Sequence, residues 1–331
     1  LVTAVQFTQP GRDGRLGFYR EGTHDLCSVE ATGQLLPETL AWLASAEAVL
    51  QRVSLTGLSA LEFSENIPGS ERAVRVEVHE GVDASRFRAL VTDEQAVTDV
   101  LRVREDDPAT TLRLRRNVRS FFQGNRFLLE RLVHHVAALV PEGPVVDLYA
   151  GVGLFGLALA ARGANDVMLV EGDVASGADL VANAEPFADR ARVRRASVEA
   201  FVSAGSIRGE ATVIVDPPRT GVSKEAIAGI IRHKPARIVY VSCDVAALAR
   251  DTRSLLDAGY ALEAVTGVDL GFYLPATFVP ETASRPVFAL FLGTAFAISA
   301  LPVIAKILSD LDLMRRNVAQ MLLATAMADD V

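Results

Sequence analysis

The sequence predicts an α/β fold with a parallel sheet, preceded by a β-rich part and followed by an apolar helical tail. From about residue 125 to 268, short apolar strands alternate with helical stretches, which is typical of a parallel sheet covered on both faces. Residues 1 to about 110 instead show short strands separated by turns. After about residue 285 the chain is almost uninterruptedly apolar.

The strands of the predicted parallel sheet recur at regular intervals. They are Val145–Tyr149, Val167–Val170, Val193–Arg195, Thr212–Val215 and Arg237–Ser242. Helical stretches separate them, among them Lys224–Arg232 and Val245–Asp257. Because ligands of open α/β sheets bind beyond the carboxyl ends of the strands, we expect the functional site at that edge.

The β-rich part is predicted from two kinds of pattern. Gly17–Tyr19 and Arg72–Val78 are typical of short strands, and Gly11–Gly14 of a turn. Apolar residues recur with helical spacing over Glu38–Val53, which predicts a helix there. We expect an antiparallel domain over residues 1–115, the parallel-sheet domain over 116–285 and the tail over 286–331.

The composition limits the class of protein. The 331 residues carry a net charge of −8 and only two cysteines, Cys27 and Cys243. Two cysteines exclude a disulfide framework and a cysteine-rich metal site, so we expect no metal and a reducing, cytoplasmic compartment. The first residue is Leu1 rather than Met, so we expect the true start to be missing, and we see no secretory leader.

A run of arginines stands out against the negative net charge. Only Glu130 opposes it, and the run is typical either of a solvated helix face or of a surface that contacts RNA. Its members are Arg113, Arg115, Arg116, Arg119, Arg126 and Arg131.

A glycine-rich turn follows the first strand of the predicted sheet. In Asp147-Leu-Tyr-Ala-Gly-Val-Gly153, Gly151 and Gly153 let the backbone turn tightly and approach a ligand. Such a turn also suits a nicotinamide cofactor, or can serve the fold alone. Asp147 before the glycines favours S-adenosylmethionine, and Glu171 at the end of the second strand could accept hydrogen bonds from both ribose hydroxyls.

Two further motifs follow the fourth and fifth predicted strands. In Asp216-Pro-Pro-Arg219, two prolines stiffen the loop and fix its carbonyl groups and carboxylate at the edge of the sheet. The alternative is a rigid loop that only holds a salt-bridged arginine. Val241-Ser-Cys243-Asp precedes a predicted helix, whose positive dipole end favours a thiolate. A lone cysteine is often a buried apolar filler, but this position at a strand end favours a nucleophile.

Taken in order, the motifs resemble those of the RNA (uracil-5-)-methyltransferase family. They are Phe121-Phe-Gln-Gly-Asn125, the turn from Asp147, Asp216-Pro-Pro-Arg-Thr-Gly221 and Tyr240-Val-Ser-Cys-Asp244. The resemblance covers about residues 1 to 270, including Gly14-Arg-Leu-Gly-Phe-Tyr19 in the β-rich part.

The resemblance implies a Rossmann-like class I methyltransferase sheet that methylates carbon 5 of a uridine in RNA. It implies that Cys243 attacks carbon 6 of the base and that a general base later removes the carbon-5 proton. The target base must leave its stack. The resemblance also implies that the β-rich part, residues 1–115, is an RNA-binding or central domain, and it favours ribosomal over transfer RNA. The residues implied to bind S-adenosylmethionine are Gln123, Tyr149, Gly151, Gly153, Glu171 and Asp216.

The sequence departs from the family at two places. Some members hold an iron–sulfur cluster with four cysteines, but Thr32 stands in the place of the last one and Cys27 is out of register, so we expect no cluster. The family's terminal base motif corresponds to the segment from Asp269 to Glu281, where Val279 replaces the histidine. Glu281 is therefore a candidate general base, or else a surface residue.

The tail has a different character. Pro286–Leu308 is long enough to cross a bilayer and resembles a core helix of monovalent cation:proton antiporters. Asp329 and Asp330 would match the aspartate of a neighbouring antiporter helix. The alternative is that Val287–Leu292 is the last strand of the sheet and the rest an apolar docking helix.

Three hypotheses follow from the sequence. The first is a monomeric enzyme that methylates RNA and could associate with a membrane through its tail. The second is an antiporter fragment joined to a methyltransferase. The third is an inactive relative that binds RNA and S-adenosylmethionine but lacks a competent base.

Overall fold

A computed structural model describes residues 4–5, 16–19, 26–28, 35–53, 55–205 and 207–266. The described residues form two compact units. The first comprises those within 1–138 and 150–196, and the second those within 139–149 and 197–266.

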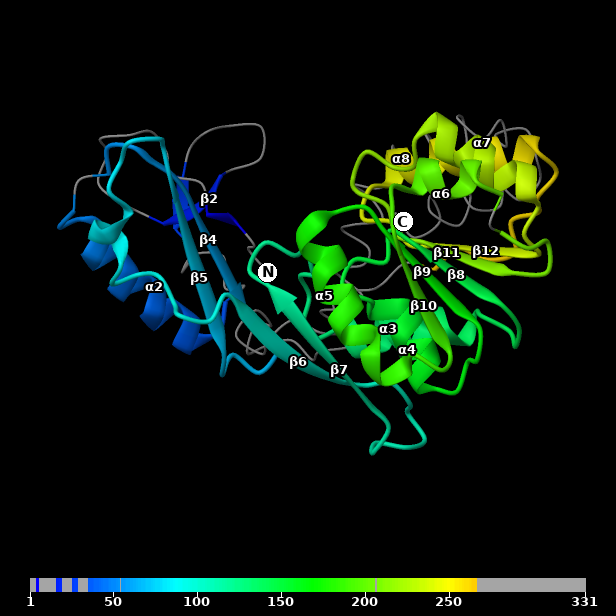
Figure 1. Ribbon diagram of the computed structural model, residues 1–331, viewed down its shortest axis with the longest axis horizontal. Helices are drawn as coiled ribbons and strands as arrows, with labels where there is room; N and C mark the ends of the chain where they lie inside the picture. Colours follow the sequence, from blue (N-terminus) through cyan, green and yellow to red (C-terminus); the bar gives the residue numbers. More distant parts are fainter. Residues whose placement is uncertain are drawn as a thin grey trace, which may run out of the picture. The chain divides into compact units, whose positions relative to one another are not determined.

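The amino-terminal part of the first unit consists of antiparallel strands and one long helix, as predicted (Figure 1). Strand β2 (Gly17–Tyr19) pairs with β3 (Leu26–Ser28), and β6 (Ala96–Arg102) with β7 (Thr111–Asn117). A three-stranded sheet has the order β1 (Ala4–Val5), β4 (Leu58–Glu65) and β5 (Arg72–Val78).

Helix α2 (Pro37–Leu50) buries one face against this sheet. Its residues Leu43, Ala46 and Leu50 are buried at the spacing of one helix face, and they join Leu61 and Phe63 of β4 in one core. Each fully buried leucine or phenylalanine contributes about 1.5–3 kcal/mol, so this packing holds the helix in place.

The predicted parallel sheet is present, with five strands in the order β10–β9–β8–β11–β12. The predicted ranges agree closely with β8 (Val145–Leu148), β9 (Val167–Glu171), β10 (Ala191–Arg195), β11 (Thr212–Val215) and β12 (Arg237–Tyr240).

Helix α2 ends at Leu50 rather than at the predicted Val53, and β10 begins at Ala191 rather than at Val193. Two strands also end earlier than predicted. Strand β8 stops before Tyr149, whose φ of 60° is left-handed and takes the chain out of the ladder. Strand β12 ends at Tyr240, two residues before the predicted end, and the Ser242 hydroxyl donates to the carbonyl of Asp244 at the start of the next helix (2.8 Å).

Helices α6 (Val198–Ser203), α7 (Lys224–His233) and α8 (Val245–Asp257) belong to the second unit. Figure 1 shows them together on one face of β11 and β12. Each begins at a side chain that caps the helix, namely Ser197, Ser223 and Asp244. The predicted range of α8 agrees with the structure at both ends, and that of α7 within one residue.

The first unit also contains three helices that follow its β-rich part. They are α3 (Leu129–Ala138), α4 (Leu154–Ala161) and α5 (Val174–Ala184). Helix α4 is buried from Leu154 to Ala160, because apolar residues surround its whole circumference.

The predicted tail of residues 286–331 lies outside the described residues, as do Thr32, Gly11–Gly14 and the segment from Asp269 to Glu281. Of the helices that the structure describes, none is both long and apolar enough to cross a membrane.

Candidate active site

Two glycines of the turn after β8 have left-handed backbone conformations. Gly151 has a φ of 57° and Gly153 a φ of 102°, both in the region that glycine adopts without strain. A Cβ on Gly153 would lie 2.4 Å from Cδ1 of Leu157, whereas one on Gly151 would meet no atom within 4 Å. Gly153 therefore serves the packing of α4, and Gly151 leaves its backbone open to a ligand.

Glu171 lies at the end of β9 and is tied to this turn. Its Oε2 accepts a hydrogen bond from the Gly151 amide (2.7 Å) and its Oε1 one from the Asp173 amide (2.6 Å). A carboxylate can accept about four hydrogen bonds, so these two fix its orientation and leave acceptor capacity for a ligand.

Helix α5 contributes two polar residues that no sequence motif indicated. Asn183 donates to the carbonyls of Val152 in the glycine turn (2.9 Å) and of Arg115 in β7 (2.8 Å), and accepts from the Arg115 amide. One turn earlier, Asp179 accepts from the Ser120 hydroxyl (2.6 Å) and from Arg115. Their signal in the sequence is a pair of polar residues four apart on the buried face of an amphipathic helix.

These contacts place the loop after β7 beside the same helix. The loop leads to the Phe121–Asn125 motif, in which Gln123 is half-buried. Asp179 and Asn183 thus hold the glycine turn and the approach to this motif on one helix face.

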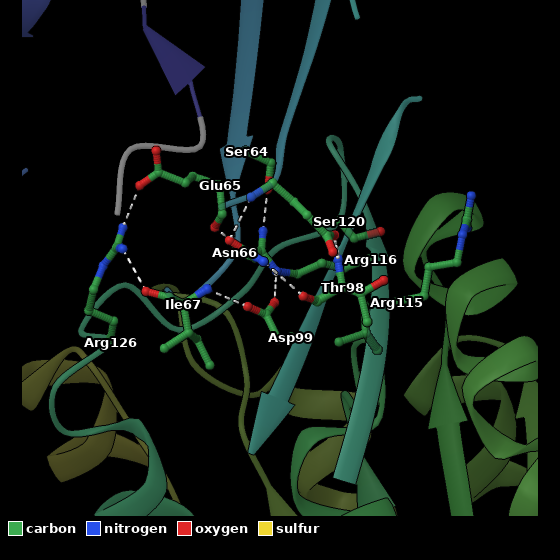
Figure 2. Close-up of polar contacts among 12 residues, drawn as sticks. Ser64, Glu65, Asn66, Ile67, Thr98, Asp99, Arg115, Arg116, Ser120 and Arg126 are labelled. Atoms are coloured by element: carbon green, nitrogen blue, oxygen red, sulfur yellow. Dashed lines mark hydrogen bonds and ion pairs between the residues drawn. The ribbon is translucent and has the colours of Figure 1, made fainter. Parts of the chain in front are cut away.

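The arginine run is not a solvated helix face, since Arg113, Arg115 and Arg116 lie on β7. Figure 2 shows that two of its members, Arg116 and Arg126, are held by internal contacts. The guanidinium of Arg116, 1 % exposed, donates to Asp99 (2.6 Å), to the Ser64 hydroxyl and to a backbone carbonyl.

Two further arginines of the run are paired within the first unit. Arg126 donates to Glu65 (3.0 Å) and to the carbonyl of Ile67 (2.7 Å), and Arg115 pairs with Asp179 (3.0 Å). Glu65 is itself fully buried. Half of the run therefore stabilises the fold, because buried charges require partners of opposite charge.

In the second unit, three candidate residues follow neighbouring strands. Leu148, Val215 and Tyr240 are register partners at the ends of β8, β11 and β12. Tyr149 and Asp216 are the next residues of their strands, and Cys243 lies three residues beyond Tyr240. The carboxyl ends of adjacent parallel strands share an edge, which is where ligands of such sheets bind.

Cys243 is exposed and stands at the corner between β12 and α8. It is therefore not a buried filler. The next residue, Asp244, caps α8 by accepting a hydrogen bond from the Ala247 amide (2.7 Å). The positive end of the helix dipole lies beside the thiol, although the capping carboxylate offsets part of that charge.

The candidate base Glu281 lies outside the described residues. Within the described ranges, no group of three or more histidine, cysteine or acidic side chains could hold a metal ion.

The sheet order, the glycine turn after the first strand and the acid after the second define a Rossmann-like α/β protein of the nucleotide-cofactor-binding class. Residues 64–265 match the model of the family described as tRNA (Uracil-5-)-methyltransferase. The chain belongs to this family.

Two relatives illustrate the similarity. A tRNA (uracil(54)-C(5))-methyltransferase of Pyrococcus abyssi is 35 % identical over 160 residues, which are 47 % of this chain and 36 % of the relative. A 23S rRNA (uracil(1939)-C(5))-methyltransferase RlmD of Pseudomonas putida is 30 % identical over 311 residues, covering 87 % of this chain and 66 % of the relative. The chain spans about a third of the length of the first relatives it matches.

A solved structure has the same fold. It is the Pyrococcus abyssi tRNA (uracil-54, C5)-methyltransferase in complex with S-adenosyl-L-homocysteine, with a TM-score of 0.54 and 24 % identity. The match covers 77 % of this chain and 69 % of that chain.

Proposed function

We propose that this protein methylates carbon 5 of a uridine in RNA, with S-adenosylmethionine as the methyl donor. Family membership and the names of the relatives support the reaction class. The single observation that carries the proposal is the exposed thiol of Cys243 at the carboxyl edge of the parallel sheet.

Cys243 would activate the substrate, which is necessary because carbon 5 of uracil is by itself a poor nucleophile. Bond formation between the Cys243 sulfur and carbon 6 moves an electron pair toward carbon 5 and the carbonyl oxygen, giving an enolate. S-adenosylmethionine supplies the methyl group when it is bound. A general base then takes the carbon-5 proton, and the sulfur leaves carbon 6 with its electron pair.

The residues proposed to bind the cofactor are those implied by the family resemblance. They are Gln123, Tyr149, Gly151, Gly153, Glu171 and Asp216. The open space over Gly151 and the fixed carboxylate of Glu171 fit this assignment, since the first lets a ligand approach backbone and the second offers acceptors for ribose hydroxyls. Glu281 remains the proposed general base.

Ribosomal RNA is the proposed substrate class. The similarity to the 23S rRNA enzyme extends over 87 % of this chain, against 47 % for the tRNA enzyme, and this longer match supports the choice. The target uridine would have to leave its stack, which is easiest in a loop or a bulge.

The proposal is tested by transfer of labelled methyl groups from S-adenosylmethionine to unmodified ribosomal and transfer RNA. We expect 5-methyluridine in the ribosomal RNA, loss of at least about 10³-fold in rate for Cys243→Ala and full activity for Cys27→Ala, the matched control. Full activity of Cys243→Ala would refute the assignment of Cys243 as the nucleophile. If a Glu281→Gln variant fails to accumulate a covalent RNA adduct, the assignment of Glu281 as the general base is wrong.

For the tail, we propose a junction near residue 285 between the methyltransferase, over residues 116–285, and an antiporter-like segment. Aggregation of the full chain that is relieved by ending it at 285 supports the junction. A monodisperse full-length chain without detergent contradicts it.

A further inference from the structure

Asp251 is a buried carboxylate on helix α8 with no place in the reaction described above. It is 2 % exposed, and its oxygens accept hydrogen bonds from three different segments. Oδ2 accepts from the Tyr240 hydroxyl (2.7 Å) and the Val222 amide (2.8 Å), and Oδ1 accepts from Arg250 (2.7 Å). A carboxylate this deeply buried is stable only when it is so paired.

The same helix fixes the end of the Asp216–Gly221 loop. Arg250 donates to the carbonyl of Thr220 (2.9 Å), and Gly221 turns the chain with a φ of 77°. A Cβ on Gly221 would lie 2.4 Å from Arg250 and 2.5 Å from Asp251. The loop therefore rests directly against these two side chains, and only glycine fits there.

The nucleophile lies on the segment that Asp251 joins to this loop. Tyr240 ends β12, α8 begins at Val245, and Cys243 is between them. Burial and the nearby charge of Asp251 raise the pKa of Tyr240 well above its usual value, so its hydroxyl stays a donor. One carboxylate thus joins the end of the Cys243 strand, the Asp216 loop and α8.

We propose that Asp251 is a positioning residue that sets the Cys243 corner relative to the Asp216–Gly221 loop. This rests on the proposed function, in which Cys243 is the nucleophile and Asp216 binds the methyl donor. In this role Asp251 needs no contact with substrate or cofactor. It acts by keeping the two segments in register, and a misplacement of about 1 Å in such a site can cost about a hundredfold in rate.

The test compares Asp251→Asn with Asp257→Asn. The control changes an exposed carboxylate on the same helix that pairs with Arg253. Single-turnover methyl transfer at saturating S-adenosylmethionine is measured at a temperature where both variants are folded. We expect Asp251→Asn to slow this step by about tenfold or more with the dissociation constant of the cofactor changed less than about threefold, and Asp257→Asn to match the wild type.

A second variant covers the case in which Asp251→Asn does not fold. Arg250→Met removes the bonds to Thr220 and Asp251 but leaves the two donors on Oδ2, and its side chain is 57 % exposed. We expect about a threefold to tenfold loss in the same rate. If every folded variant transfers methyl groups at the wild-type rate, the positioning role is wrong.

The failure of this inference can be told from a failure of the proposed function. In a Cys27→Ala background, the rate of alkylation by iodoacetamide reports on Cys243 alone and needs no RNA. We expect Asp251→Asn to change that rate by at least about threefold, and Asp257→Asn to leave it unchanged. A wild type that alkylates normally but never methylates RNA refutes the proposed function, whereas identical alkylation in both variants refutes the positioning role.

Discussion

Replacing Arg116 with methionine should lower the free energy of unfolding of the first unit substantially. Arg116 and Asp99 have side chains 1 % and 0 % exposed, and their atoms lie 2.6 Å apart. Methionine keeps the apolar stem but leaves Asp99 buried without its cation, although the Ile67 amide still donates to it (2.6 Å). Breaking one side of a buried pair costs about 3–5 kcal/mol, a large part of the roughly 5–15 kcal/mol by which domains are stable.

Urea unfolding followed by circular dichroism measures this effect through the shift in the transition midpoint. The matched control is Arg102→Met, which breaks the exposed pair with Glu130 and should leave the midpoint within error. Replacing both members of the buried pair, as in Arg116→Met with Asp99→Leu, should recover much of the loss. An Arg116→Met midpoint equal to that of Arg102→Met would refute the reasoning.

Three further predictions concern the turn and helix α5. Asn183→Ala should raise the dissociation constant of S-adenosylmethionine about tenfold, because the glycine turn loses its anchor; isothermal titration measures this, and unchanged affinity would contradict it. Gly153→Ala should cost about 1–3 kcal/mol of stability in thermal unfolding, whereas Gly151→Ala, with open space, should cost less. Burial alone would raise the pKa of Asp173, but hydrogen bonds from Ser176 lower it below the ordinary 3.8. The stability that the Asp173 cap gives to α5 should therefore be complete above pH 3.8 and be lost as the pH falls through the depressed pKa. The free energy of unfolding of the wild type and of Asp173→Ala, compared from pH 5 to 2, measures this contribution. A difference between the two proteins that stays constant over this range would contradict the prediction.

The regular elements could be predicted from the sequence because their signals are local. The extent of α8 was predicted correctly, since a cap at Asp244 and helical spacing up to Asp257 lie within the segment itself. Strand β8 ends one residue before the predicted end, because nothing in the sequence signals that Tyr149 adopts a left-handed conformation.

The contacts around the site could not be predicted, because their partners are distant in sequence. Arg116 is 17 residues from Asp99 and 52 from Ser64. The sequence therefore shows the cluster of arginines but not the acidic and polar partners that hold them. Asn183 contacts Arg115 across 68 residues. The sequence therefore indicates which residues follow the strand ends, whereas the side chains that hold those segments emerge only from the fold.

The central claim is that the sulfur of Cys243 bonds to the target uridine. The most direct measurement is mass spectrometry of the peptide containing Cys243 after incubation with S-adenosylmethionine and RNA that carries 5-fluorouridine. Fluorine cannot leave carbon 5 as a proton does, so the sulfur should stay bonded to carbon 6. We predict a methylated fluorouridine nucleotide attached to Cys243. An adduct on another residue, or methylated RNA from the natural substrate with no adduct from the fluorinated one, would contradict the account.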